Sequence, residues 1–125
     1  MKPTSRVPII ICGLLLLASC GRQQQAKSLV RDFVDAYAQQ EIDINSFSDI
    51  DSTRVITDSL ILAMRDKAAA DPLFKSPVLS DFRAQGNRRQ TLLYIRMRYQ
   101  EPGDTLEQSR TFYFDRDLGG IIAFK

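Results

Sequence analysis

The chain has 125 residues, which is enough for one domain. It contains no histidine, and this excludes Ser-His and Cys-His catalytic pairs and His-containing metal sites from within the chain. The 17 basic and 15 acidic residues leave a formal net charge of only +2.

The first residues have the layout of a bacterial export signal. Lys2 and Arg6 give the chain a positive start. The stretch from Val7 to Leu17 is apolar apart from a proline, a cysteine and a glycine, and small residues then lead to Cys20. This order of charge, apolar run and small residues is typical of a secretory signal peptide.

The end of this signal differs from an ordinary cleavage site. Leu17-Ala18-Ser19-Cys20, followed by Gly21, resembles the lipobox of bacterial lipoproteins. The resemblance implies that residues 1–19 are removed and that the Cys20 thiol carries a diacylglycerol. It also implies that the new amine receives a fatty acid such as palmitate. We expect no other cofactor.

Lipidation of Cys20 has two alternatives, a membrane-spanning helix and a structural thiol. A membrane-spanning helix needs about 20 apolar residues, whereas the run from Val7 to Ala18 is shorter and contains a proline and a glycine. A structural thiol at Cys20 would have no disulfide partner, because Cys12, the second cysteine, leaves with the signal. Both alternatives are weaker than the lipid anchor, which binds stably when two or more acyl chains are present.

Removal of residues 1–19 makes the chain formally neutral. The signal holds two basic residues, Lys2 and Arg6, and no acidic residue, so the mature chain has equal numbers of both kinds. Domains that bind nucleic acid usually carry a clear positive excess. We therefore expect no nucleic acid partner.

Residues 20–25 are predicted to be the lipidated cysteine and a short polar tether. Gly21 to Gln25 contains no acidic residue, and acidic residues after the cysteine resemble a surface-export signal in some bacteria. We expect a protein of the bacterial cell envelope that is anchored in a membrane and faces the periplasm. A tether this short keeps the domain near the bilayer.

Residues 26–125 are expected to form a single domain that begins with a helix. From Ala26 to about Gln40, apolar residues recur at the spacing of one helical face. A second helix is predicted from about Thr57 to Ala70, with Thr57 as the N-cap and Asp71-Pro72 as the stop signal.

The stretch from Glu41 to Ser52 is predicted to be a loop with apolar anchors. Asp43 and Asn45 begin a calcium-loop pattern, but Phe47 stands where a third oxygen ligand is needed and Ser48 replaces the turn glycine. We expect no metal site here. Four apolar residues are expected to reach the core: Ile42, Ile44, Phe47 and Ile50.

After Pro77 the apolar period changes from that of a helix to that of a strand. Four strands are predicted: Val78–Gln85, Gln90–Gln100, Thr105–Asp115 and Ile121–Phe124. A hairpin centred on Pro102-Gly103 pairs Tyr99 with Leu106, Leu93 with Phe112 and Arg98 with Glu107. This register also puts two polar side chains, Gln108 and Arg110, on the apolar face.

Two helices followed by an antiparallel meander predict an α+β fold with both helices on one face of a four-stranded sheet. This order resembles the cystatin-like and nuclear-transport-factor-like (SnoaL-like) folds, in which a curved sheet wraps a helix. Together with the lipobox it also resembles small lipoproteins of Bacteroidales-type bacteria. No catalytic motif of those families has a counterpart in this chain.

The concave face of the sheet offers one candidate ligand site. Arg110, with Gln108 and Tyr99, is expected at the open end, where an arginine can hold a carboxylate or phosphate. The simpler interpretation is a solvated Arg110, or an ion pair with an acidic neighbour such as Asp32 or Asp35.

The opposite, outer face offers a second candidate, an interaction surface for an envelope protein or for anionic lipid. An ordinary solvent-facing sheet surface is the alternative. The residues concerned are Arg88, Arg89, Tyr94, Arg96 and Arg98, with Tyr113 among them.

An enzyme is the weakest of the hypotheses. Asp81 and Tyr94 could act as acid and base, but we expect them on the outer face, where pKa shifts are hard to achieve. The sequence therefore predicts a lipid-anchored, non-catalytic binding or protein-interaction module, with a small-ligand pocket as the alternative.

Overall fold

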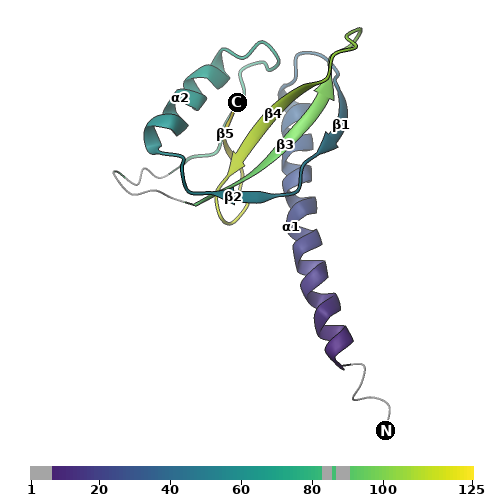
Figure 1. Ribbon diagram of the computed structural model, residues 1–125. Coiled ribbons are helices and arrows are strands. Elements are labelled where there is room, and N and C mark those ends of the chain that lie inside the picture. The colour runs from purple at the N-terminus through teal and green to yellow at the C-terminus, as the bar shows by residue number, and fades with distance from the viewer. Residues whose placement is uncertain (1–6, 83–85, 87–90) are drawn as a thin grey trace.

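A computed structural model describes residues 7–82, 86 and 91–125. Within these residues the protein is an α+β domain with two helices and an antiparallel sheet of five strands (Figure 1). The predicted fold class is confirmed, while the sheet has one strand more than predicted. The elements are α1 (Val7–Tyr37), β1 (Asp43–Phe47), β2 (Asp51–Thr53), α2 (Asp58–Ala69), β3 (Leu92–Gln100), β4 (Gln108–Phe114) and β5 (Ile121–Phe124).

The sheet is built around β3. Its order is β1-β3-β4-β5, and β2 also pairs with β3, on the same side as β1. Ser48 bridges the gap between β1 and β2: its N–H donates to Arg96 O at 2.9 Å, and its Oγ accepts from Arg96 N at 2.8 Å. The segment predicted as a loop is therefore an interrupted edge strand.

The apolar anchors predicted in this segment are confirmed. Ile42, Ile44, Phe47 and Ile50 are half-buried and pack against the main core. Their polar neighbours, such as Asp43 and Asn45, are exposed.

α1 is one continuous helix that extends beyond the sheet (Figure 1). Residues 21–25, predicted as a polar tether, lie within it, because glutamine and arginine are good helix formers. Among the described residues, no helix combines the length and the apolar character needed to cross a membrane.

Two glutamines of this segment fix α1 to the domain. The Gln23 side chain donates from Nε2 to Ser48 O at 3.0 Å, and its Oε1 accepts from Ile50 N at 2.6 Å. Gln25 Nε2 donates to Leu118 O at 3.3 Å, in the turn between β4 and β5. The helix therefore leaves the domain between the β1–β2 loop and the β4–β5 turn.

The first core lies between α1 and one face of the sheet. α1 contributes a buried stripe, which confirms the predicted helical face: Ala26, Val30, Phe33 and Val34. The strands contribute Leu93, Ile95, Met97, Tyr99, Phe112, Phe114, Ile121 and Phe124. Alternation along β3 and β4 places these residues on one face.

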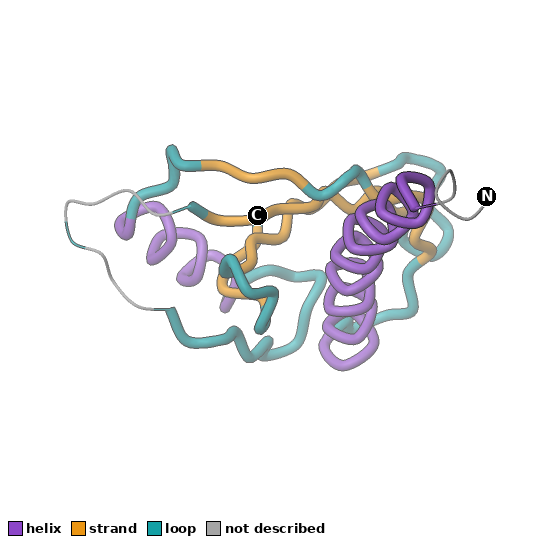
Figure 2. The backbone as a smooth tube through the Cα atoms, turned by 90° about the horizontal axis from the view of Figure 1, so that it is seen from below, coloured by secondary structure: helices purple, strands orange, loops and turns teal. Residues whose placement is uncertain are grey.

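α2 packs against the other face of the sheet, so the predicted arrangement of both helices on one face is wrong. Ile61 and Met64 form a second core with Leu92, Tyr113, Ile122 and Ala123, which point away from the first. Ala68 still joins the first core. Figure 2 shows the two helices well apart, with the strands spanning between them. The apolar stripe of a helix does not encode which face of a sheet it covers.

The start of α2 confirms its predicted cap. Thr57 is extended, and its Oγ1 accepts a hydrogen bond from Leu60 N at 3.3 Å. Asp58 lies in the first turn, where its charge suits the helix dipole. The predicted bounds of this helix are correct to within one residue at each end.

The β3–β4 hairpin is shifted by two residues from the predicted register. Tyr99 pairs with Gln108, Met97 with Arg110, Ile95 with Phe112 and Leu93 with Phe114. The shift keeps the side chains of β3 and β4 on their predicted faces and aligns both phenylalanines with apolar partners. Leu106, predicted to face Tyr99, is instead 71% exposed in the turn.

The first predicted strand, Val78–Gln85, is not present over residues 78–82, and residues 83–85 lie outside the described residues. This segment lies beside β5 and is joined to it by a backbone hydrogen bond, from Ser80 N to Ile121 O at 2.8 Å. Arg65 of α2 completes the contact, because its Nη1 donates to Ser80 O at 2.8 Å and to Ile122 O at 2.7 Å.

Candidate functional site

The outer face of β3 carries a hollow of about 390 Å³. We call it the outer hollow. It lies on the part of this face near β1 and β2, and one of its lining residues, Tyr94, also packs against the second core. Its lining residues are Ser46, Phe47, Ser48, Asp49, Asp51, Tyr94, Arg96 and Arg98.

β3 supplies the aromatic and basic side chains of the outer hollow. Tyr94, Arg96 and Arg98 alternate with buried residues, so they point to the outer face, as predicted. Arg96 and Arg98 are exposed, and Tyr94 is half-buried beside Tyr113, with the ring centroids 6.0 Å apart. The buried residues that alternate with them pack into the core and fix the position of β3. The backbone that carries the two arginines is therefore well ordered.

The interrupted edge strand supplies the opposite wall of the outer hollow. Asp51 Oδ2 lies 3.5 Å from the Tyr94 hydroxyl, which donates to it. Ser48 Oγ is engaged by Arg96 N, which fixes the loop over the middle of β3. Our sequence reasoning missed this wall, because its pairing with β3 bridges more than forty residues of sequence.

The two arginines differ in their partners. Arg98 Nη1 lies 4.0 Å from Glu107 Oε1, with both side chains about half exposed. Glu107 also accepts from Asn45 Nδ2 at 2.8 Å. Arg96, in contrast, has no ion pair to a carboxylate within the described part of the chain. The outer hollow thus presents the Arg96 guanidinium beside a tyrosine, hydroxyl groups and the carboxylates of Asp49 and Asp51. This mixed set suits a polar partner surface that places a carboxylate at Arg96.

Two predicted members of this surface, Arg88 and Arg89, lie outside the described residues. Asp81 and Tyr94 are the residues considered above as an acid–base pair. The Tyr94 hydroxyl donates to Asp51 rather than to Asp81. Among the described residues, no group of three or more Asp, Glu, Cys or His side chains is placed to hold a metal ion.

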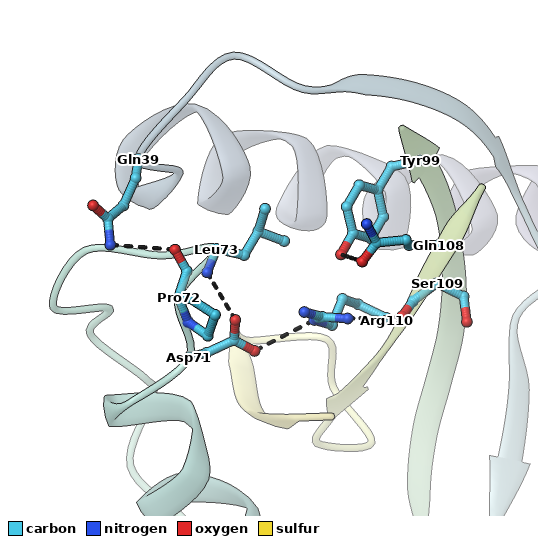
Figure 3. Close-up of polar contacts among 8 residues, drawn as sticks. All are labelled: Gln39, Asp71, Pro72, Leu73, Tyr99, Gln108, Ser109 and Arg110. Atoms are coloured by element: carbon cyan, nitrogen blue, oxygen red, sulfur yellow. Dashed lines mark hydrogen bonds and ion pairs between the residues drawn. The ribbon is translucent and has the colours of Figure 1, made fainter. Parts of the chain in front are cut away.

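The concave-face residues Arg110, Gln108 and Tyr99 do lie together (Figure 3). The Tyr99 hydroxyl donates to Gln108 Oε1 at 3.3 Å, and the Arg110 guanidinium carbon lies 5.7 Å from the centroid of the Tyr99 ring. Burial raises the pKa of Tyr99, Arg110 lowers it in part, and Glu101 and Asp71 raise it. The tyrosine therefore stays protonated and serves as a hydrogen-bond donor.

Arg110 is held by an acidic residue, but by a different one from those expected. Its Nε lies 3.3 Å from Asp71 Oδ2, and the two side chains are 22% and 14% exposed. Asp71, just after α2, is fixed by Leu73 N, which donates to its Oδ1 at 2.9 Å. The geometry is that of an ion pair without an aligned hydrogen bond at Nε. A carboxylate ligand at Arg110 would compete with Asp71, so this site is less available than the outer hollow.

Comparisons of the chain with protein-family models, with curated proteins and with solved structures gave no match.

Proposed function

We propose that this chain is a lipid-anchored protein of the bacterial cell envelope that binds a partner protein through its outer hollow, without catalysis. The observation that carries the binding role is the exposed Arg96 guanidinium, which lacks an ion pair within the described residues and borders a hollow of about 390 Å³. The partner surface that fits it carries carboxylates and polar groups. Arginine and tyrosine are the residues most often enriched at such interfaces.

The lipid anchor is supported by the export signal that ends in Leu17-Ala18-Ser19-Cys20. The fold is proposed to be cystatin-like or nuclear-transport-factor-like, on the support of a helix packed against an antiparallel sheet. The second helix on the outer face is a departure from the simple form of that arrangement. A small-ligand site at Arg110 is the alternative function, and it requires displacement of Asp71.

The anchor is tested by labelling growing cells with an alkyne-tagged fatty acid. We expect the wild-type protein and the Cys12→Ser variant to be labelled and to lose residues 1–19. The Cys20→Ser variant should carry no label and should keep the signal, because its hydroxyl does not replace the thiolate as the nucleophile that accepts the diacylglyceryl group. Intact mass spectrometry reports both events. An unlabelled wild-type protein would contradict the anchor.

The outer hollow is tested with a photoreactive residue in place of Ser46, which lines it. We expect a crosslinked adduct of one defined mass in the envelope of the producing cell. Charge reversal by Arg96→Glu and Arg98→Glu should reduce it by about tenfold or more, because like charges across an interface cost several kcal/mol.

Two controls make this experiment specific. A photoreactive residue at Leu62, which is 53% exposed on α2, should give no such adduct. The double change Lys67→Glu and Lys75→Glu alters the net charge equally at other exposed sites and should leave the adduct intact. An adduct at Ser46 that survives reversal of both arginines would exclude the proposed site.

A further inference from the structure

A second hollow, of about 560 Å³, lies where α1 leaves the domain. It is lined by Arg22 of α1, Arg116 and Asp117 of the β4–β5 turn, and Thr91 and Leu93 at the start of β3. We call it the rim hollow. Arg22 and Arg116 are far apart in the sequence and exposed, yet they line the same space.

The position of the rim hollow relative to Cys20 is fixed by α1. Gln23 is hydrogen-bonded to the β1–β2 loop, and Ala26 is completely buried, so the helix is immobilised from Gln23 onward. Cys20 lies three residues earlier in the same helix, about 5 Å along its axis at 1.5 Å per residue. Even a fully extended chain would separate them by only about 10 Å.

This geometry places the rim hollow at a membrane surface if Cys20 carries lipid. The allowed separation is about one Debye length, which is about 8 Å at physiological ionic strength, so salt screens the attraction between the rim charges and the lipid headgroups only in part. The opposite end of α1, at Tyr37, lies about 25 Å from Cys20 along the helix axis. The rim hollow and the β1–β2 loop, which Gln23 contacts, are therefore the parts of the domain nearest to the headgroups.

The charges of the rim hollow suit a phosphate group. Neither Arg22 nor Arg116 forms an ion pair in the part of the chain that the structure describes. Nearby Asp115 is occupied, because its Oδ1 accepts from Gly119 N at 2.8 Å, and Asp117 is the acidic member of the lining. The two guanidinium groups outnumber the single carboxylate of Asp117 in this lining, and a guanidinium group binds phosphate through paired hydrogen bonds.

We propose that Arg22 and Arg116 bind the phosphate of an anionic phospholipid in the leaflet that holds the anchor, and so fix the orientation of the domain. This inference rests on the proposed lipid anchor at Cys20 but is independent of the outer hollow. It adds a second membrane contact of defined geometry, which determines the direction in which the outer hollow faces.

The experiment uses the full chain, processed and lipidated in cells, in vesicles of phosphatidylcholine with or without phosphatidylglycerol. A fluorophore is attached at Ser52→Cys, since Ser52 pairs with Leu93 beside the rim hollow. The mature chain offers no other free thiol, because Cys20 is acylated and Cys12 is removed. A quencher on the lipid headgroups reports how close the label lies to the bilayer.

We expect stronger quenching in phosphatidylglycerol vesicles than in phosphatidylcholine alone. Each arginine near an anionic surface shifts the docked-to-free ratio by about fivefold, so both together shift it by about 25-fold. The double variant Arg22→Gln and Arg116→Gln should lose this lipid dependence. The double variant Lys67→Gln and Lys75→Gln should keep it, because neither lysine lines the rim hollow. Lys67 lies on α2, and Lys75 N donates to Tyr37 O at the far end of α1. A label at Leu106→Cys, in the β3–β4 turn, should show little quenching in either lipid.

Vesicle flotation separates the two proposals. Protein that does not float with phosphatidylcholine lacks the anchor, and this result would overturn both the anchor and the present inference. Protein that floats but is quenched equally in both lipids would overturn the inference alone. Arginine-dependent binding of inorganic phosphate in detergent, with no effect of phosphatidylglycerol, would assign the hollow to free phosphate and likewise overturn it.

Discussion

Replacing Phe33 by alanine is expected to destabilise the domain by about 3–5 kcal/mol, the usual cost of deleting a buried aromatic side chain. Phe33 is 7% exposed and packs α1 against the other residues of the first core. Its ring lies 4.9–5.9 Å from four others, in mostly edge-to-face contacts: Tyr37, Phe74, Phe112 and Phe124. Alanine would leave a cavity between the helix and the sheet and would remove these ring contacts.

The measurement is urea unfolding followed by circular dichroism. Phe33→Leu should lose clearly less than alanine, because it keeps most of the apolar volume. Leu62→Ala is the matched surface control and should stay within about 0.5 kcal/mol of wild type, since Leu62 is exposed on α2. A loss below about 1 kcal/mol for Phe33→Ala would mean that the packing of the Phe33 ring contributes little to the stability of the core.

Replacing Arg65 by alanine should have the next largest effect, a loss of about 2–4 kcal/mol. One guanidinium nitrogen serves the carbonyls of Ser80 and Ile122, and the guanidinium carbon lies 5.3 Å from the centroid of the Phe82 ring. Ile122 is 1% exposed, so its carbonyl would be left without this donor in a buried setting. A buried carbonyl that lacks a donor lowers the free energy of unfolding by more than the net contribution of the hydrogen bond itself.

Two further variants separate the contributions of Arg65. Arg65→Met keeps the apolar stem but no donor, and it should lose almost as much stability as alanine. Arg65→Lys keeps the charge but not the planar fork, and it should recover part of the loss. The exposed Lys67→Ala is the control on the same helix. If methionine matched wild type in urea unfolding, packing of the stem alone would explain Arg65.

Local pattern in the sequence predicted the helices and the faces of the long strands. The apolar stripe from Ala26 and the Thr57 cap are local signals, and the structure confirms both. The edge strand at Asp43–Phe47 was missed because its polar residues resemble a loop, and only pairing with β3 makes it extended. The two-residue shift of the hairpin was invisible to alternation, because both registers place the same side chains on the same face.

The candidate sites were predictable to the same extent. Alternation along β3 placed Tyr94, Arg96 and Arg98 on one surface, as the structure confirms. The opposite wall, from Ser46 to Asp51, depends on a long-range pairing that the sequence does not reveal. The simpler interpretation of Arg110 was a solvated side chain or an ion pair with an acidic neighbour such as Asp32 or Asp35, whereas its partner is Asp71. Charge alone predicts that a buried arginine needs an acid, but the path of the chain after α2 decides which acid it meets.

The contact of Gln23 with the β1–β2 loop has a consequence for self-association. Its side-chain amide donates to Ser48 O and accepts from Ile50 N, as the peptide group of an adjacent strand would. These groups lie where the edge strand is interrupted, and a free edge is a template for pairing with a second chain. The Gln23 side chain occupies the carbonyl of Ser48 and the N–H of Ile50, so these two groups are not available to a strand of a second chain. It thereby lowers the tendency of these molecules to form intermolecular sheets where they are concentrated.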